Sequence, residues 1–247
     1  MSTPTKTIAF LGATGGCGLS ALRRSLAAGD TCIALCRTPA KMEALFPDKP
    51  VNLVLKQGNA HDAAAVASVL TCPSDASRLV DAVNFSIGAA VVLPSITMDD
   101  PDVCRKGVAA VLEALAKLRA DCGAAGRPLI AMVSSTGISP HGRDVPLLLV
   151  PFYRYGLRVA HVDKRAAEEA LSGSGERFVI VRPSLLTNGE RPDRKIRVHV
   201  EGPGGIEQKE VGYFISREDV GRWMFENLLE SAEAGSKYEG KAVGLTW

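Results

Sequence analysis

The stretch TIAFLGATGGCG at residues 7–18 decides the fold of this chain. An apolar, strand-forming run over 7–11 leads directly into a glycine-rich turn, and an amphipathic helix is predicted over 16–28. Strand, turn and helix in this order are typical of a dinucleotide-binding unit, in which N–H groups at the helix N-terminus face the pyrophosphate. We therefore expect a cofactor site that includes Gly12, Thr14, Gly15, Gly16, Cys17 and Gly18.

The glycines at 12, 15 and 18 follow a GxxGxxG spacing rather than the commoner GxGxxG. They allow a tight turn, a close approach of the backbone to a pyrophosphate and close packing of the helix on its strand. A glycine trio also occurs by chance in turns that bind nothing, but the strand before it and the helix after it favour a cofactor site.

Composition limits the classes of partner. The chain has 247 residues, with 29 Lys and Arg against 27 Asp and Glu, and these charges are spread along its length. This balance provides no extended basic face for nucleic acid, so a small-molecule substrate is expected. The six cysteines lack CxxC pairs and metal-ligand spacing, which predicts a reduced cytoplasmic protein without a metal. The apolar run at 145–150 is too short for a membrane span, and no leader precedes the first strand.

Apolar runs alternate with helical patterns along the chain, which predicts an α/β, Rossmann-like, doubly wound parallel sheet. The length suits one domain over 1–247, in which residues 184–215 form a small C-terminal insertion that covers the substrate. Asp100 before Pro101 is predicted to cap the fourth helix. The strands are expected near 7–11, 31–36, 51–56, 82–86, 129–134, 178–182 and 242–245, and the helices near 16–28, 39–46, 62–70, 101–119, 155–172 and 216–229.

The end of the second strand indicates which cofactor binds. In such folds an acidic residue there bonds the 2′-hydroxyl of NAD, whereas a basic residue neutralises the 2′-phosphate of NADP. Arg37 stands at this place and Lys41 follows one helical turn later, so NADP is predicted. The alternative is that both are ordinary surface cations on a solvated turn.

Two further strand ends complete the predicted cofactor site. Asn59 follows the third strand and is placed to bond the edge of the adenine, while Asp62 is expected to cap the next helix. Ser86, Ile87 and Gly88 follow the fourth strand, where small residues allow the backbone to approach the nicotinamide ribose and the diphosphate. Packing alone would also explain Gly88.

The order of these motifs resembles the short-chain dehydrogenase/reductase superfamily. After the glycine-rich turn and Arg37 come VSSTG at 133–137, a helix that carries Lys164, and VIVRPS at 179–184. More narrowly, the chain is similar to the atypical, NmrA-like branch, which includes small flavin and biliverdin reductases and oxidoreductases of fungal secondary metabolism. The resemblance implies a serine after the fifth strand that holds the substrate oxygen, here Ser135, with Thr136 as the neighbour that substitutes for it. It also implies a lysine, here Lys164, that bonds the nicotinamide ribose.

One residue of the family pattern is missing. Typical members carry a YxxxK pair whose tyrosine protonates the carbonyl oxygen, and Ala160 stands where that tyrosine is expected. Three replacements stay open: Tyr153 or Tyr155 from the start of the helix, His161, or a bound water. His161 is rotated by about 100° from Ala160 on a regular helix, so a surface or core-edge position is as good an expectation for it as a catalytic one.

The leading hypothesis is an NADP-dependent oxidoreductase that transfers hydride to a small, largely apolar carbonyl, quinone or conjugated substrate. One alternative is a redox-sensing regulator that binds NADP without turnover. Another is a non-redox isomerase or rearrangement enzyme on the same fold. Sequence alone does not distinguish a monomer from a homo-oligomer.

Overall fold

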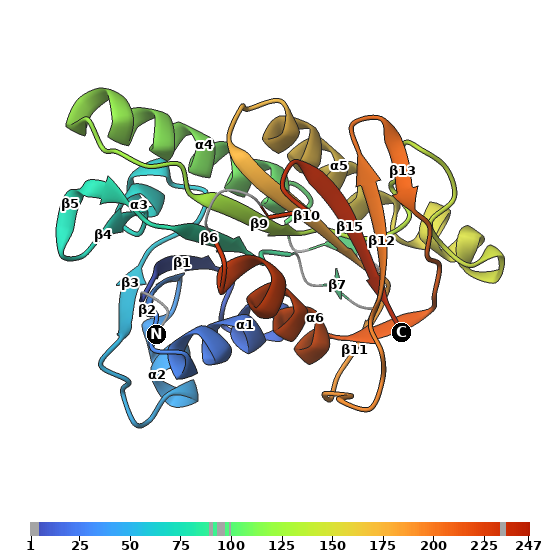
Figure 1. Cartoon of the computed structure of the whole chain (residues 1–247), viewed down its shortest axis with the longest axis horizontal. Coiled ribbons are helices and arrows are strands. Elements are labelled where there is room, and N and C mark those ends of the chain that lie inside the picture. Colours follow the sequence, from blue (N-terminus) through green and yellow to red (C-terminus); the bar gives the residue numbers. More distant parts are fainter. Residues whose placement is uncertain (1–4, 89–90, 93–96, 99, 233–235) are drawn as a thin grey trace.

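The central element is one mostly parallel sheet, seen in a computed structural model that describes residues 5–88, 91–92, 97–98, 100–232 and 236–247. Within these residues, nine strands pair in the order β13–β12–β15–β10–β9–β6–β1–β2–β3 (Figure 1). The predicted doubly wound parallel sheet is confirmed. The seven parallel strands are β1 (Thr7–Leu11), β2 (Thr31–Cys36), β3 (Leu53–Gln57), β6 (Ala82–Phe85), β9 (Leu129–Val133), β10 (Arg177–Pro183) and β15 (Lys241–Thr246).

Helices cover both faces of this sheet (Figure 1). Two separate apolar clusters form because β1, for example, directs Ile8 and Phe10 to one face and Ala9 and Leu11 to the other. The first face packs against α1 (Gly16–Ala27), α2 (Pro39–Leu45), α6 (Arg217–Met224) and the π-helical turn η3 (Phe225–Leu229). The second face packs against α3 (Ala63–Ala67), α4 (Val103–Cys122) and α5 (Arg158–Ser172).

The sequence patterns do not predict the shortest elements, because segments of two to six residues carry too little periodicity. Residues 184–215 form four strands, of which two extend the central sheet in antiparallel fashion and two pair with each other. The extending strands are β12 (Arg197–Gly202) and β13 (Gly205–Gln208), and the separate pair is β11 (Leu185–Thr187) and β14 (Phe214–Ser216). The remaining short elements are β4 (Thr71–Cys72), β5 (Asp75–Leu79), β7 (Val91–Val92), β8 (Thr97–Met98), η1 (Leu147–Leu149) and η2 (Phe152–Gly156).

Strand order reverses between β1 and β6, and the glycine-rich turn lies at this point. A Cβ atom at Gly12, whose φ is +89°, would lie 2.7 Å from the backbone carbon of Ser86. A Cβ atom at Gly18 would lie 2.5 Å from the carbonyl oxygen of Gly12. Both glycines are therefore required for close packing of β1, α1 and the end of β6. The carboxyl ends of the strands at such a reversal form the crevice in which open α/β sheets bind ligands.

The predicted cap of the fourth helix is wrong. The helix begins at Val103 and its N-cap residue is Asp102, whose side chain forms no capping hydrogen bond. Instead the Asp163 carboxylate, from α5, accepts hydrogen bonds from the backbone N–H groups of Cys104 and Arg105 at 2.8 and 2.9 Å. An anion at a helix N-terminus satisfies free N–H groups and the helix dipole. This contact holds α5 against α4, next to Lys164.

Candidate active site

The first part of the crevice carries two positively charged side chains, Arg37 and Lys41. It is a cavity of about 380 Å³ bordered by Gly12, Thr14, Gly15, Arg37, Lys41, Asn59, Ser86, Ile87 and Gly88. Arg37 and Lys41 form no ion pair with any described residue, so their charges remain available to a ligand. Asn59 Oδ1 accepts the backbone N–H of His61 at 3.1 Å, which leaves the side-chain NH₂ of Asn59 to donate to a base. Asp62 caps α3 as predicted, because its carboxylate accepts from Ala64 and Ala65.

The second part lies at the N-terminus of α1 and fits a pyrophosphate. A Cβ atom at Gly15 would meet nothing within 4 Å, so open space faces the turn there. The helix carries no acidic residue in its first turn and no side chain caps it. Cys17 borders the same space, and burial raises the pKa of its thiol to about 12, so it stays neutral.

Arg217 is a charged residue of this region that the sequence analysis missed. A Cβ atom at Gly16 would lie 3.4 Å from Cδ of Arg217, so the arginine side chain covers the turn. Its guanidinium donates to Asn188 Oδ1 at 2.8 Å and to the carbonyl oxygens of Leu186 and Thr187. In the sequence Arg217 reads only as the first residue of α6, and nothing in that pattern predicts that the helix starts beside the glycine-rich turn.

The third part of the crevice extends over the ends of β6, β9 and β10 as a cavity of about 470 Å³. Ser86, Ile87, Gly88, Ser135, Ala160, His161 and Lys164 border it, together with Leu185 and Leu186 from the start of the 184–215 segment. Ser134 Oγ, also at this cavity, is buried and has no hydrogen-bond partner among the described residues. Such an unpaired buried hydroxyl fits a site completed by a polar ligand. The residues of all three parts thus fit a nicotinamide dinucleotide.

Ser135, His161 and Lys164 meet at this third part. Ser135 Oγ lies 3.5 Å from His161 Nε2 and 3.0 Å from the carbonyl oxygen of Thr136. Lys164 Nζ donates to the carbonyl oxygen of Val133, the last residue of β9, at 3.3 Å. Burial, together with the positive charges of Lys164 and Arg165, lowers the pKa of His161 to about 4. His161 is therefore a neutral imidazole near pH 7.

The position of His161 shows why helix geometry alone left its place open. Leu157, Ala160, His161 and Lys164 all border the cavity. These positions follow the i, i+3, i+4, i+7 spacing of residues that share one face of a helix. A rotation of about 100° from Ala160 therefore keeps His161 within the same stripe rather than on the surface.

Tyr153 and Thr136 lie next to this cluster, and Tyr153 also borders the cavity of the third part. Thr136 Oγ1 lies 3.2 Å from the Tyr153 hydroxyl and 3.3 Å from the carbonyl oxygen of Pro183, and Thr136 does not border the third cavity. Burial raises the pKa of Tyr153, and its ring lies against His161 with centroids 5.8 Å apart. Tyr155 is 74% exposed and borders neither of the two cavities of the crevice. The structure thus brings Tyr153 to His161 and leaves Tyr155 outside.

A buried ionic network fixes the back of α5, and the sequence analysis missed it. Arg182 on β10 forms a bidentate pair with Glu168, at 3.1 and 2.6 Å, and a further bond of 2.6 Å with Glu201 on β12. His199 Nε2 lies 2.9 Å from Glu201. Although burial opposes it, hydrogen bonds from His199 and Ser139 and the charge of Arg182 lower the pKa of Glu201 to about 2. These partners come from three elements, so sequence spacing does not reveal them.

Comparison with known proteins agrees with this geometry. The model of the NAD(P)H-binding family matches residues 12–231, and the chain belongs to this family. It is 40% identical to reductase pytE of Aspergillus terreus, with all of both chains covered. It is 32% identical to oxidase pynE of Aspergillus niger, over 100% of this chain and 99% of that one.

A solved structure shows the same fold. A short-chain dehydrogenase/reductase from Veillonella parvula in complex with NADP matches with a TM-score of 0.73 at 16% identity, over 99% of this chain and 95% of that one. The predicted resemblance to short-chain dehydrogenases/reductases and the prediction of a nicotinamide cofactor are confirmed. No helix within the described residues is long and apolar enough to span a membrane.

Proposed function

We propose that the protein is an NADP-dependent oxidoreductase that transfers hydride to a carbonyl, quinone or conjugated small molecule. The observation that carries this proposal is the meeting of Ser135, His161 and Lys164 at the end of the crevice that starts at the glycine-rich turn. The bound nicotinamide supplies the hydride, and the protein has to orient the substrate and deliver a proton to its oxygen. The names of the two fungal relatives, a reductase and an oxidase, support the redox class.

The preference for NADP rests on Arg37 and Lys41. Both border the first cavity and neither has an ion-pair partner among the described residues. Arginine suits a phosphate because its planar guanidinium donates two parallel hydrogen bonds. We assign Arg37 and Lys41 to the 2′-phosphate, Arg217 and the N-terminus of α1 to the pyrophosphate, and Lys164 to the nicotinamide ribose.

Ser135 and His161 together take the role of the family's tyrosine, whose position is occupied here by Ala160. As hydride adds to the substrate carbon and the C=O π bond opens, the oxygen takes the proton of the Ser135 hydroxyl. His161 returns a proton to Ser135 from Nε2 and takes one from water at Nδ1, so charge does not accumulate on either residue. A neutral imidazole is suited to this relay because one nitrogen donates while the other accepts. His161 borders both the crevice and a neighbouring solvent-open cavity, which provides the water.

The test measures NADPH binding and NADPH consumption with a panel of quinones, flavins and ketones. We expect Ser135→Ala and His161→Gln to lower turnover by about 100-fold, the low end for loss of acid–base catalysis, without changing NADPH affinity. Tyr155→Phe is the matched control, because Tyr155 is exposed and lies away from the crevice. Full activity of both Ser135→Ala and His161→Gln would exclude the relay.

The same measurements separate the two alternative functions. A protein that binds NADPH with a different affinity from NADP⁺, but converts no compound of the panel, would be a redox sensor rather than an enzyme. Conversion of a panel compound without net loss of NADPH would show that the protein is an isomerase rather than an oxidoreductase.

A further inference from the structure

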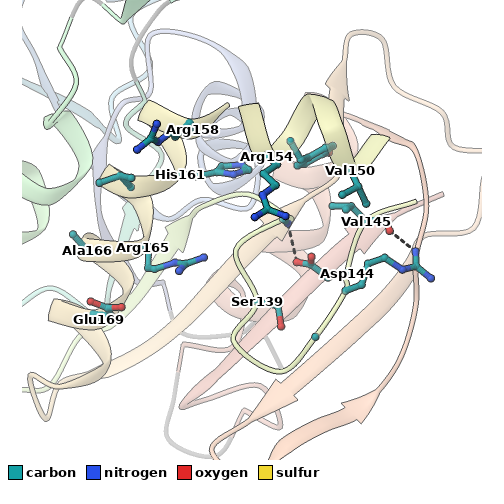
Figure 2. Close-up of a pocket in the computed structure, with 15 residues that line it drawn as sticks. Ser139, Asp144, Val145, Val150, Arg154, Arg158, His161, Arg165, Ala166 and Glu169 are labelled. Carbon is teal, nitrogen blue, oxygen red and sulfur yellow. Dashed lines mark hydrogen bonds between the residues drawn. The ribbon is translucent and has the colours of Figure 1, made fainter. Parts of the chain in front are cut away.

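A separate cavity of about 670 Å³, called the second cavity below, opens next to the crevice (Figure 2). It lies between the loop that follows β9, the turn η2 and the outer side of α5. Tyr153 and His161 border both this cavity and the third part of the crevice. These two rings are buried and lie 5.8 Å apart between centroids, so they separate the second cavity from the space beside Ser135. The second cavity is itself large enough for a ligand of drug-like size.

The charge of this cavity is predominantly positive. Its border includes two carboxylates, Asp144 and Glu169, and four guanidinium groups, on Arg143, Arg154, Arg158 and Arg165. None of these arginines forms an ion pair with a described residue. The carboxylate of Asp144 is turned inward and accepts the backbone N–H of Gly137 at 2.8 Å, and burial raises its pKa.

Two of the four arginines are placed to act together. Figure 2 shows Arg154, from η2, and Arg165, from α5, extending into the cavity from different sides. Arg158 points away from them in the same view. The guanidinium of Arg143 is already engaged, because it donates to the carbonyl oxygen of Val145. Val145, Val150 and Ala166 also border the cavity and add apolar surface to it.

We infer that the second cavity is a ligand site in which Arg154 and Arg165 bind the anionic group of a conjugated small molecule, such as a carboxylate or an ionised enol, on the side of His161 away from Ser135. This inference goes beyond the proposed oxidoreductase function, because it adds a second ligand site next to the site of reaction. Guanidinium groups keep their charge at all physiological pH values and form charge-assisted bonds with planar oxyanions. An apolar wall with a few convergent polar groups is the usual composition of a small-molecule site.

The test compares two quinones that share one ring system and differ in charge. Binding of the anion 1,4-naphthoquinone-2-sulfonate and of neutral 2-methyl-1,4-naphthoquinone is measured by calorimetry on the protein saturated with NADP⁺. We expect the sulfonate to bind at least about tenfold more tightly, as loss or gain of one charge-assisted hydrogen bond implies. We expect Arg154→Gln with Arg165→Gln to remove that difference and to leave the affinity for the neutral quinone unchanged.

Two controls keep this result interpretable. Arg191→Gln removes an exposed arginine that borders neither cavity, so it should change neither quinone affinity. NADP⁺ affinity is measured in every variant and should stay at the wild-type value, because Arg154 and Arg165 do not border the crevice. A wild-type protein that binds the sulfonate no better than the neutral quinone would overturn the inference, as would a double variant that keeps the difference. Failure of the proposed function is distinct, since it would appear as absence of NADPH binding or consumption.

Discussion

Protonation of His161 should make the folded protein less stable in acid, and the size of the effect follows from its surroundings. His161 is 9% exposed, and its pKa is lowered from 6.5 to about 4 by burial and by the positive charges of Lys164 and Arg165. Between pH 6.5 and 4 the unfolded chain binds a proton at this residue while the folded chain does not. Stability contributed by the neutral imidazole is therefore present above pH 6.5 and lost as the pH falls.

The magnitude comes from the pKa difference. A shift from 6.5 to about 4 corresponds to a loss of about 3 kcal/mol in the free energy of unfolding by pH 4. Urea unfolding of the wild-type protein and of His161→Gln, measured at several pH values from 7 to 4, isolates this residue because all other groups cancel in the difference. We expect the stability of the wild type relative to the variant to fall by about 3 kcal/mol over this range.

An independent readout is the NMR titration of the histidine ring protons. The chain has only four histidines, so the signal of His161 is identified as the one that His161→Gln removes. The reasoning is refuted if His161 titrates near 6.5, or if the difference in unfolding free energy between the two proteins does not change with pH.

Four further substitutions test other parts of the structure. Arg37→Gln should weaken NADPH binding by at least about tenfold, from loss of charge-assisted hydrogen bonds, and leave NADH binding unchanged in a fluorescence titration. Gly18→Ala should cost about 1–3 kcal/mol of stability, because its Cβ atom would lie 2.5 Å from the Gly12 carbonyl oxygen. Gly15→Ala, where the Cβ atom meets nothing within 4 Å, should keep the melting temperature and lose NADPH affinity; equal melting temperatures for both alanine variants would contradict the packing argument. Arg182→Met should lower stability by about 3–5 kcal/mol in chemical denaturation, since it leaves the buried Glu168 carboxylate without its bidentate partner and removes the guanidinium from the buried Glu201. A loss below about 1 kcal/mol would show that the network is not needed.

The cofactor half of the site was accessible from the sequence because its signals are local. Gly12 and Gly18 lie within one strand–turn–helix unit, and Arg37 stands at the end of the next strand. A parallel α/β sheet brings the carboxyl ends of its strands to one edge. Residues at those ends therefore lie close together, whichever segments connect the strands. The structure places Gly12, Arg37 and Asn59 around one cavity accordingly.

The substrate half was not accessible in the same way. Residues 184–215 show no long periodic pattern, and the sequence did not indicate that β12 and β13 would extend the central sheet. Asp163, on α5, caps the N-terminus of α4, and no sequence pattern predicts that these two helices meet there. Contacts of this kind depend on how elements separated by many residues pack, and no short pattern records them.

The sequence by itself determined a dinucleotide-binding α/β fold, a family and a missing tyrosine, because strand periodicity, glycine geometry and the charge of a single turn residue act over a few neighbouring positions. Only the tertiary structure decided that His161 faces Ser135, that Arg217 covers the glycine-rich turn, and that Arg154 and Arg165 border a cavity next to the candidate active site. Those arrangements arise where α5, α6 and the loop after β9 pack on one sheet edge. The direction of a side chain is set there by neighbours that are distant in the chain.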